Sequence, residues 1–283
     1  MNSGWISGLS IHSASLAVHR RARPGYGAAG MRMLWPSPAD DVDPVATYAA
    51  DTRRAMAERP WVLVNMIASA DGSAIDAGGA SGGLGGPADR AVFSAIRAVA
   101  DVIVAGAATV VAEDYGPARP PAAVRRSRLE RGQAAVPRIA VVTASLSIDP
   151  DQRLFREAPA AASPLVLTVE RADPVRRQAL EGVAEVHVTG ADRVDWRRAM
   201  AVLRSAAGAR TVLCEGGPST VAQLVADDLV DELCLTVAPT LVAGPGPRIA
   251  QGPRTPPRQL TLDRVLTEDD FLFLRYLRER AAG

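Results

Sequence analysis

Residues 215–220, Glu-Gly-Gly-Pro-Ser-Thr, place two glycines and two hydroxyls after a carboxylate, and the glycines and hydroxyls suit anion binding. They continue a strand-like run, Thr211–Glu215, and Pro218 is typical of the first turn of a helix. Glycines let a ligand approach the backbone, and the amides at a helix N-terminus attract negative charge. The pattern predicts a cradle for the phosphates of a cofactor. Two glycines also suit a plain strand-to-helix bend, and no Gly-x-Gly-x-x-Gly follows the first expected strand.

Three further loops follow strand-like runs, at residues 69–72, 106–114 and 143–147. Ligands of open α/β sheets bind beyond the carboxyl ends of the parallel strands. We therefore expect these loops and residues 215–220 to surround one ligand site. Residues 77–86 contain six glycines, which would let the backbone come close to a ligand.

The elements that must position these loops alternate between strands and helices. Strands are expected at 61–69, 101–106, 138–143, 164–170, 184–189, 211–215 and 232–242, and helices near 47–58 and at 88–100, 107–112, 173–181, 195–207 and 219–227. Runs at 259–266 and 271–277, joined by an acidic turn, predict a hairpin. The order predicts an α/β fold with one doubly wound, mostly parallel sheet and a C-terminal antiparallel hairpin.

The 283 residues are expected to divide into a tail and one domain. We expect residues 1–35 to be a disordered or mis-annotated N-terminal tail, with Met31 or Met33 as the true start, and residues 36–283 to form the domain. The tail has a basic cluster but no continuous apolar core, so a secretory signal is not expected.

The composition favours a globular protein with a small-molecule partner. A hydrophobic content of 48% is enough for a large core. A formal net charge of +1 gives the protein no strong overall positive or negative potential that would attract a charged macromolecule. We therefore expect no nucleic-acid or membrane partner, since no apolar run approaches the roughly 20 residues that span a bilayer. Every basic residue is Arg, which excludes a Schiff-base lysine and a P-loop lysine.

The cysteines and histidines do not suggest a metal site. Cys214 and Cys234 lie in apolar runs without a Cys-x-x-Cys pattern, which predicts buried free thiols in a reducing cytoplasm. The three histidines, at positions 12, 19 and 187, are too scattered to share a ligand set, so we assign no metal.

An ordered set of residues resembles a known family. The set is Asn65, Ser69, Asp71 and Gly72, then Ser81, Arg97, Gly106, Thr109, Glu113 and Asp114, and finally residues 215–217, 231–233 and Pro239. Over residues 60–277 the chain resembles the riboflavin-biosynthesis pyrimidine reductase family, the C-terminal domain of bifunctional deaminase-reductase proteins. The fold of that family is similar to dihydrofolate reductase.

The resemblance implies an NADPH-dependent oxidoreductase similar to 5-amino-6-(5-phosphoribosylamino)uracil reductase, which transfers a hydride to ribose C1′, and a homodimer. By position it places NADPH against Ile67, Gly83, Thr109, Glu113, Gly217, Pro218, Ser219, Thr220, Val221, Ala222 and Gln223. It places the substrate against Ser81, Arg97 and Glu215. Arg97 would clamp a phosphate, and Glu215 would accept from hydroxyls or base N–H groups. No proton donor is assigned.

The chain departs from the family pattern at three places. Glu113 stands where Asp is usual, Gly82 and Gly83 replace an aromatic residue, and residues 115–120 replace a segment whose Arg grips the substrate phosphate. Arg119 could substitute for that Arg. A dihydrofolate or other pteridine reductase on the same fold, and a non-catalytic nucleotide-binding protein, therefore stay open as alternatives.

Three smaller expectations complete the prediction. No His-x-Glu or Pro-Cys-x-x-Cys motif is present, so no deaminase activity is expected. Arginines near residues 143–153 favour NADPH over NADH. Asp71 is expected to close the turn before Gly72.

Overall fold

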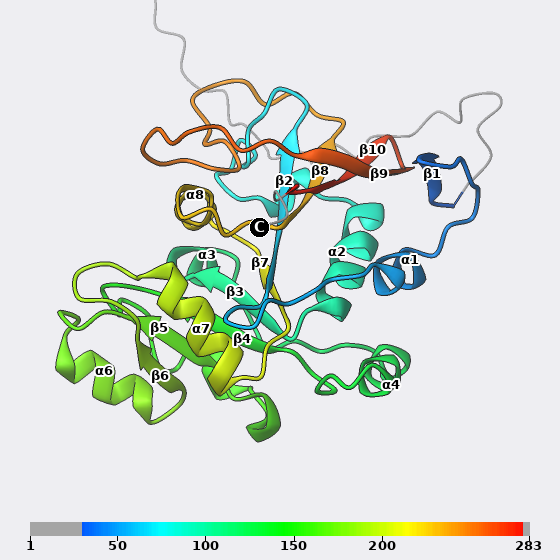
Figure 1. The fold of residues 1–283 in the computed structure, drawn as a ribbon. Coiled ribbons are helices and arrows are strands. Elements are labelled where there is room, and N and C mark those ends of the chain that lie inside the picture. The colour runs from blue at the N-terminus through cyan, green and yellow to red at the C-terminus, as the bar shows by residue number, and fades with distance from the viewer. Residues whose placement is uncertain (1–29, 280–283) are drawn as a thin grey trace, which may run out of the picture.

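Residues 30–279, the part of the chain that this computed structural model describes, form one ten-stranded mixed sheet with helices on both faces (Figure 1). The strand order is β1-β9-β10-β8-β2-β7-β3-β4-β5-β6. The strands are β1 (Arg32–Trp35), β2 (Trp61–Ser69), β3 (Val102–Gly106), β4 (Arg138–Val142), β5 (Leu165–Thr168), β6 (Glu185–Val188), β7 (Thr211–Cys214), β8 (Glu232–Ala238), β9 (Thr261–Glu268) and β10 (Phe271–Leu277). The α-helices are α1 (Pro44–Ala50), α2 (Pro87–Val99), α3 (Ala107–Ala112), α4 (Ala122–Glu130), α5 (Arg153–Arg156), α6 (Pro174–Glu181), α7 (Trp196–Ala206) and α8 (Pro218–Ala226), and the 3-10 helices are η1 (Gly82–Leu84) and η2 (Ala160–Ala162).

The strands from β8 to β6 in this order run parallel, whereas β10, β9 and β1 pair antiparallel at one edge. Parallel strands between two helix layers are buried on both faces, so their sequences are nearly continuous apolar runs. Residues 62–64 of β2 and 165–167 of β5 accordingly expose 0% of their surface. The predicted α/β class, with a mostly parallel sheet and the hairpin β9–β10, is confirmed.

The helices begin where the local sequence favours it. Asp173 and Asp195 cap α6 and α7 by accepting hydrogen bonds from backbone amides of the first turn. Pro87 and Pro218 occupy the first positions of α2 and α8. In Figure 1, α1, α2 and α4 lie to one side of the central strands β2 and β7, and α8 lies to the other. Within residues 30–279 no helix is long and apolar enough to cross a membrane.

The structure corrects three predicted boundaries. The helix expected near 47–58 is α1, which ends at Ala50 because Asp51 leaves the helix to form buried ion pairs. The strand expected to reach residue 242 stops at Ala238, since Pro239 has no amide to extend the ladder. Residues 32–35, expected within the N-terminal tail, instead form β1 and pair with β9. The expected disorder of residues 1–29 lies outside the described residues.

Buried ion pairs fasten the segment before β2 to the antiparallel end of the sheet. Glu232 of β8 has no exposed surface and accepts from Nε of Arg53 at 2.8 Å and from Nε of Arg275 at 2.7 Å. Asp231 accepts from Nη1 of Arg59 at 2.6 Å. These two acidic residues, part of the family resemblance, therefore have a structural role: they hold together the strands that carry the site.

The two cysteines are free and buried, as predicted. Burial raises the pKa of the Cys214 thiol to about 12 and raises that of Cys234 well above its usual value. Both thiols therefore stay protonated at neutral pH and act as small apolar side chains.

Candidate active site

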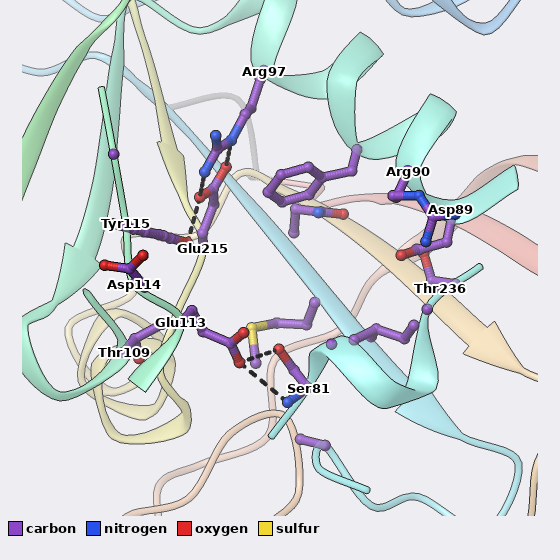
Figure 2. A pocket seen from close by; sticks show the side chains of 18 residues that line it. Ser81, Asp89, Arg90, Arg97, Thr109, Glu113, Asp114, Tyr115, Glu215 and Thr236 are labelled. Atoms are coloured by element: carbon purple, nitrogen blue, oxygen red, sulfur yellow. Dashed lines mark hydrogen bonds and ion pairs between the residues drawn. The ribbon is translucent and has the colours of Figure 1, made fainter. Parts of the chain in front are cut away.

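A cavity of about 400 Å³ lies beyond the carboxyl ends of β2, β3 and β7, against one face of α2. This is the edge of the sheet where open α/β folds bind ligands. Figure 2 shows its polar side chains in three groups, which are Arg97 with Glu215 and Tyr115, Ser81 with Glu113, and Asp89 with Thr236. Strands, the Gly-rich loop and α2 thus each contribute to one site.

Arg97 of α2 and Glu215, the residue after β7, form a two-point ion pair with Nε–Oε1 and Nη2–Oε2 distances of 2.6 Å. The Tyr115 hydroxyl donates to Oε2 of the same carboxylate at 2.7 Å. Burial and the neighbouring Glu215 raise the pKa of Tyr115 well above its usual value, so the phenol keeps its proton. The Glu215 side chain is 2% exposed and that of Arg97 is 25% exposed. Arg97 uses Nε and Nη2 here, so Nη1 is the atom through which it could reach a ligand.

Two aromatic rings pack against the Arg97 guanidinium and restrain its orientation. The Arg97 guanidinium carbon lies 4.4 Å from the centre of the Phe93 ring and 5.4 Å from that of Tyr115. Such cation–π contacts fix the orientation of an arginine without using its hydrogen-bond donors. The group is therefore set in place before any ligand arrives.

Ser81 and Glu113 close the opposite side of the cavity. Oε1 of Glu113 accepts from the Ser81 hydroxyl at 2.8 Å and from the Ser81 amide at 3.2 Å. The resemblance assigned these residues to different ligands, Ser81 to the substrate and Glu113 to NADPH. Their hydrogen bonds connect the Gly-rich loop to the end of α3. The two residues, which the resemblance assigned to different ligands, therefore lie on the same side of the cavity.

The first turns of α3 and α8 lie close together beside the cavity, and the glycines that precede them, Gly106 and Gly217, have no room for a side chain. A Cβ on Gly217 would lie 2.9 Å from Oγ1 of Thr109, and a Cβ on Gly106 would lie 3.1 Å from Oγ1 of Thr220. Gly216 has a φ of +94°, in the region that favours glycine, and the Gly216–Gly217 peptide is cis. Backbone amides and two hydroxyls therefore gather at the start of α8, where the helix attracts an anion. This close-packed cradle fits the phosphates of a dinucleotide.

Asp71 closes a turn, as expected, and also holds a second loop. Its carboxylate accepts from the Ser69 hydroxyl at 2.5 Å and from the amides of Val242 and Ala243 at 3.2 and 2.7 Å. These hydrogen bonds, that of Ser69 first, lower the pKa of Asp71 to about 2. Asp71 therefore fastens the loop after β2 to the loop after β8 and is not one of the residues lining the cavity.

Asp89 lines the cavity and was missed in the sequence. It lies in the first turn of α2, is half-buried, and has Thr236 of β8 beside it in the cavity. Burial raises the pKa of its carboxyl, and Thr236 and Arg90 offset this only in part. The signal that could have found it is spacing: Asp89, Phe93 and Arg97 are four residues apart and share one face of the helix.

The predicted ligand residues occupy different places. Those that line the cavity are Ile67, Ser81, Arg97, Thr109, Glu113 and Glu215. Residues 217–223 form the start of α8, but the Val221 side chain packs in the core and the Gln223 side chain accepts from Trp196 Nε1 at 3.0 Å. These two side chains are engaged within the protein, and the Val221 amide donates to the Gly217 carbonyl at 3.1 Å.

Two other predicted residues are not among those lining the cavity. Gly83 packs against the Asp76 carboxylate so closely that an added Cβ would overlap it. Arg119, the candidate substitute for a phosphate-gripping Arg, is 69% exposed and pairs with Glu157 at 2.8 Å. Arg97, by contrast, lines the cavity.

The family model described as the RibD C-terminal domain matches residues 60–270. The chain belongs to this family. A 2,5-diamino-6-ribosylamino-4(3H)-pyrimidinone 5′-phosphate reductase from Archaeoglobus fulgidus is 28% identical over 186 residues, which is 66% of this chain and 83% of the relative. A protein of the same name from Methanothermobacter thermautotrophicus is 31% identical over 66% of this chain and 81% of the relative.

Two solved structures have a similar fold. A pyrimidine reductase-like protein from Corynebacterium diphtheriae has a TM-score of 0.71 and 30% identity over 78% of this chain and 93% of that chain. RibD from Acinetobacter baumannii, at 19% identity and a TM-score of 0.62 over 79% of this chain and 59% of that chain, shares the fold. This family member is therefore an oxidoreductase of the pyrimidine reductase type, as the sequence predicted, and such a reductase uses a nicotinamide cofactor.

Proposed function

We propose that the chain transfers a hydride from NADPH to C1′ of a phosphoribosylamino-pyrimidine, leaving a ribityl chain, and has no deaminase activity. The observation that carries this proposal is the position of Glu215. It pairs with Arg97 on the cavity side and directly precedes the glycines at the start of α8. A cofactor on the glycines and a substrate on Arg97 would thus meet at the end of β7, in the alignment that hydride transfer needs.

The cofactor would lie along the two helix starts. When bound, it supplies the hydride. The amides of α8 and the hydroxyls of Thr109 and Thr220 would hold its phosphates, and Ile67 would contact it from β2. Arg176 of α6 donates to Ser147 Oγ at 2.7 Å on the loop after β4, which supports recognition of an extra phosphate and hence NADPH over NADH. A homodimer and a cytoplasmic location stay predictions.

The substrate would lie in the cavity with its phosphate on Arg97. Glu215 holds the guanidinium from one side, which leaves Nη1 to meet an anion. The Ser81 hydroxyl and the Glu113 carboxylate would contact the sugar across the cavity. Because Tyr115 keeps its proton, it acts as a donor to Glu215 and not as a base.

Consumption of NADPH by the purified protein tests this proposal. We expect turnover with a ribosylamino-pyrimidine 5′-phosphate, a product heavier by two hydrogens in mass spectrometry, and no turnover with dihydrofolate. Turnover of dihydrofolate alone would support a pteridine reductase. Tight NADPH binding without turnover of any of these compounds would support a non-catalytic nucleotide-binding protein.

Gly217→Ala should weaken cofactor use specifically. The new Cβ would lie 2.9 Å from Thr109 Oγ1 and would push the two helix starts apart. We expect the KM for NADPH to rise about tenfold or more, since small displacements at a binding site have large effects. Gly182→Ala at the end of α6, far from the cavity and at a negative φ, is the matched control and should leave this KM unchanged. An unchanged KM in Gly217→Ala would contradict the placement of the cofactor.

A further inference from the structure

Asp89, Phe93 and Arg97 form a stripe on the face of α2 that lines the cavity. Figure 2 shows Asp89 and Thr236 on one side of the cavity and the Arg97–Glu215–Tyr115 group on the other. Arg97 comes eight positions after Asp89 in the helix, a distance of about 12 Å along the axis. A pyrimidine joined to a ribose phosphate is long enough to extend from one to the other. If Arg97 meets the phosphate, as in the proposed function on which this inference rests, the base lies near Asp89.

The surroundings of Asp89 fit a carboxylate that is kept for a ligand. It packs against Gly85, where an added Cβ would lie 2.8 Å from Oδ2, so the glycine leaves room for the carboxylate. Thr236, which lies beside Asp89 in the cavity, is 3% exposed and is opposite Ile67 of β2 in the sheet register. Burial raises the pKa of the Asp89 carboxyl, and the neighbouring Thr236 and Arg90 offset this only in part. Two well-placed N–H donors from a ligand would complete this compensation.

We propose that the Asp89 carboxylate binds the 2-amino group and the adjacent N3–H of a 2-aminopyrimidin-4-one, and so makes the enzyme prefer the 2-amino substrate over its 2-oxo (uracil) counterpart. The two oxygens of a carboxylate accept two parallel N–H bonds, and a 2-aminopyrimidin-4-one presents two such donors side by side. A uracil presents a carbonyl oxygen in place of the amino group. The carboxylate would then face an acceptor, which costs a hydrogen bond and adds repulsion.

A structural role for Asp89 would have different consequences. A carboxylate in the first turn of a helix interacts favourably with the helix dipole, whatever the substrate. Loss of that interaction would lower stability or activity equally for both pyrimidines. The ratio of the two kcat/KM values therefore separates recognition from helix stabilisation.

The test compares two substrates in the full-length protein with NADPH. These are 2,5-diamino-6-ribosylamino-4(3H)-pyrimidinone 5′-phosphate and 5-amino-6-(5-phosphoribosylamino)uracil. We expect the unmodified protein to prefer the diamino compound at least about tenfold in kcat/KM. Asp89→Asn should lower kcat/KM for the diamino compound about 10- to 100-fold and change that for the uracil much less, because Asn offers one acceptor and one donor. Asp173→Asn, which removes a carboxylate at the start of α6, is the matched control and should keep the preference.

Each outcome bears on one of the two proposals. Turnover of both pyrimidines without preference, or an equal loss for both in Asp89→Asn, overturns the role of Asp89 and leaves the proposed function intact. No turnover of either pyrimidine contradicts the proposed function itself. If Asp89→Asn fails to fold, two other measurements still test the role of Asp89. The unmodified protein should prefer the diamino compound, and Thr236→Val should show a smaller preference for it.

Discussion

Glu215→Gln should lower kcat/KM for pyrimidine reduction by about a hundredfold or more. The carboxylate is 2% exposed. It accepts hydrogen bonds from Nε and Nη2 of Arg97 at 2.6 Å and from the Tyr115 hydroxyl at 2.7 Å. An amide cannot balance the buried guanidinium, so Arg97 would lose the orientation in which it meets the substrate. Truncating one partner of a buried, hydrogen-bonded ion pair typically costs 2–5 kcal/mol or more, and ~2.7 kcal/mol is a hundredfold in rate.

Steady-state kinetics with the pyrimidine substrate measure this effect, and thermal unfolding shows whether the variant is folded. Tyr115→Phe removes one hydrogen bond to the same carboxylate and should cost about tenfold. Glu185→Gln, on the remote strand β6, breaks an ion pair whose glutamate side chain is 41% exposed and serves as the control with near-normal activity. A folded Glu215→Gln variant with unchanged kcat/KM would contradict the assigned role of the ion pair.

Glu232→Gln should lower the free energy of unfolding by about 3 kcal/mol or more. Glu232 is 0% exposed and is shared by Arg53 and Arg275. The variant leaves two nearly buried guanidinium groups without one of the two carboxylates that they share, the other being Asp51. Denaturant titrations monitored by circular dichroism measure the difference, and Glu185→Gln again serves as the control, with a change below ~1 kcal/mol for a half-exposed pair.

The same substitution has a defined pH dependence. Burial alone would raise the pKa of the Glu232 carboxyl, but Arg53 and Arg275 outweigh it and lower the pKa to about 2. A lowered carboxyl pKa stabilises the folded state above the ordinary value near 4.5, and the stabilisation is lost as the pH falls toward 2. The difference between the unmodified protein and Glu232→Gln should therefore be constant near neutrality and shrink below about pH 4.5. A difference that grows on acidification would contradict the ion-pair explanation.

The two glutamates show why resemblance to a family does not assign roles by itself. Glu215 and Glu232 both belong to the ordered set that carried the resemblance, and both are buried and bound by arginine. Only Glu215 lines the cavity. Its partner Arg97 comes from a helix that faces the ligand, whereas the partners of Glu232 come from β10 and from the segment before β2.

The sequence by itself determined most of the elements and the edge of the sheet that carries the site. The strand 61–69 and the helix 107–112 have the predicted bounds. A strand that is buried on both faces is a continuous apolar run in the sequence. The helix begins directly after Gly106, the last residue of β3. Residues 215–220 also lie, as predicted, at the start of a helix beside the cavity. Local rules of this kind act within one or two turns of chain, so they are visible in the sequence.

Only the tertiary structure decided which side chains meet. The Arg97–Glu215 pair joins residues 118 positions apart, and Asp89 and Thr236, which line the same cavity, come from α2 and β8. The end of α1 at Ala50 and the pairing of β1 with β9 likewise depend on partners from the C-terminal hairpin. No periodicity or turn residue encodes these contacts, because their free energy arises from burial and charge pairing between distant segments. The turn at residues 215–220 was thus visible in the sequence, whereas the place of Asp89 in the cavity followed only from the fold.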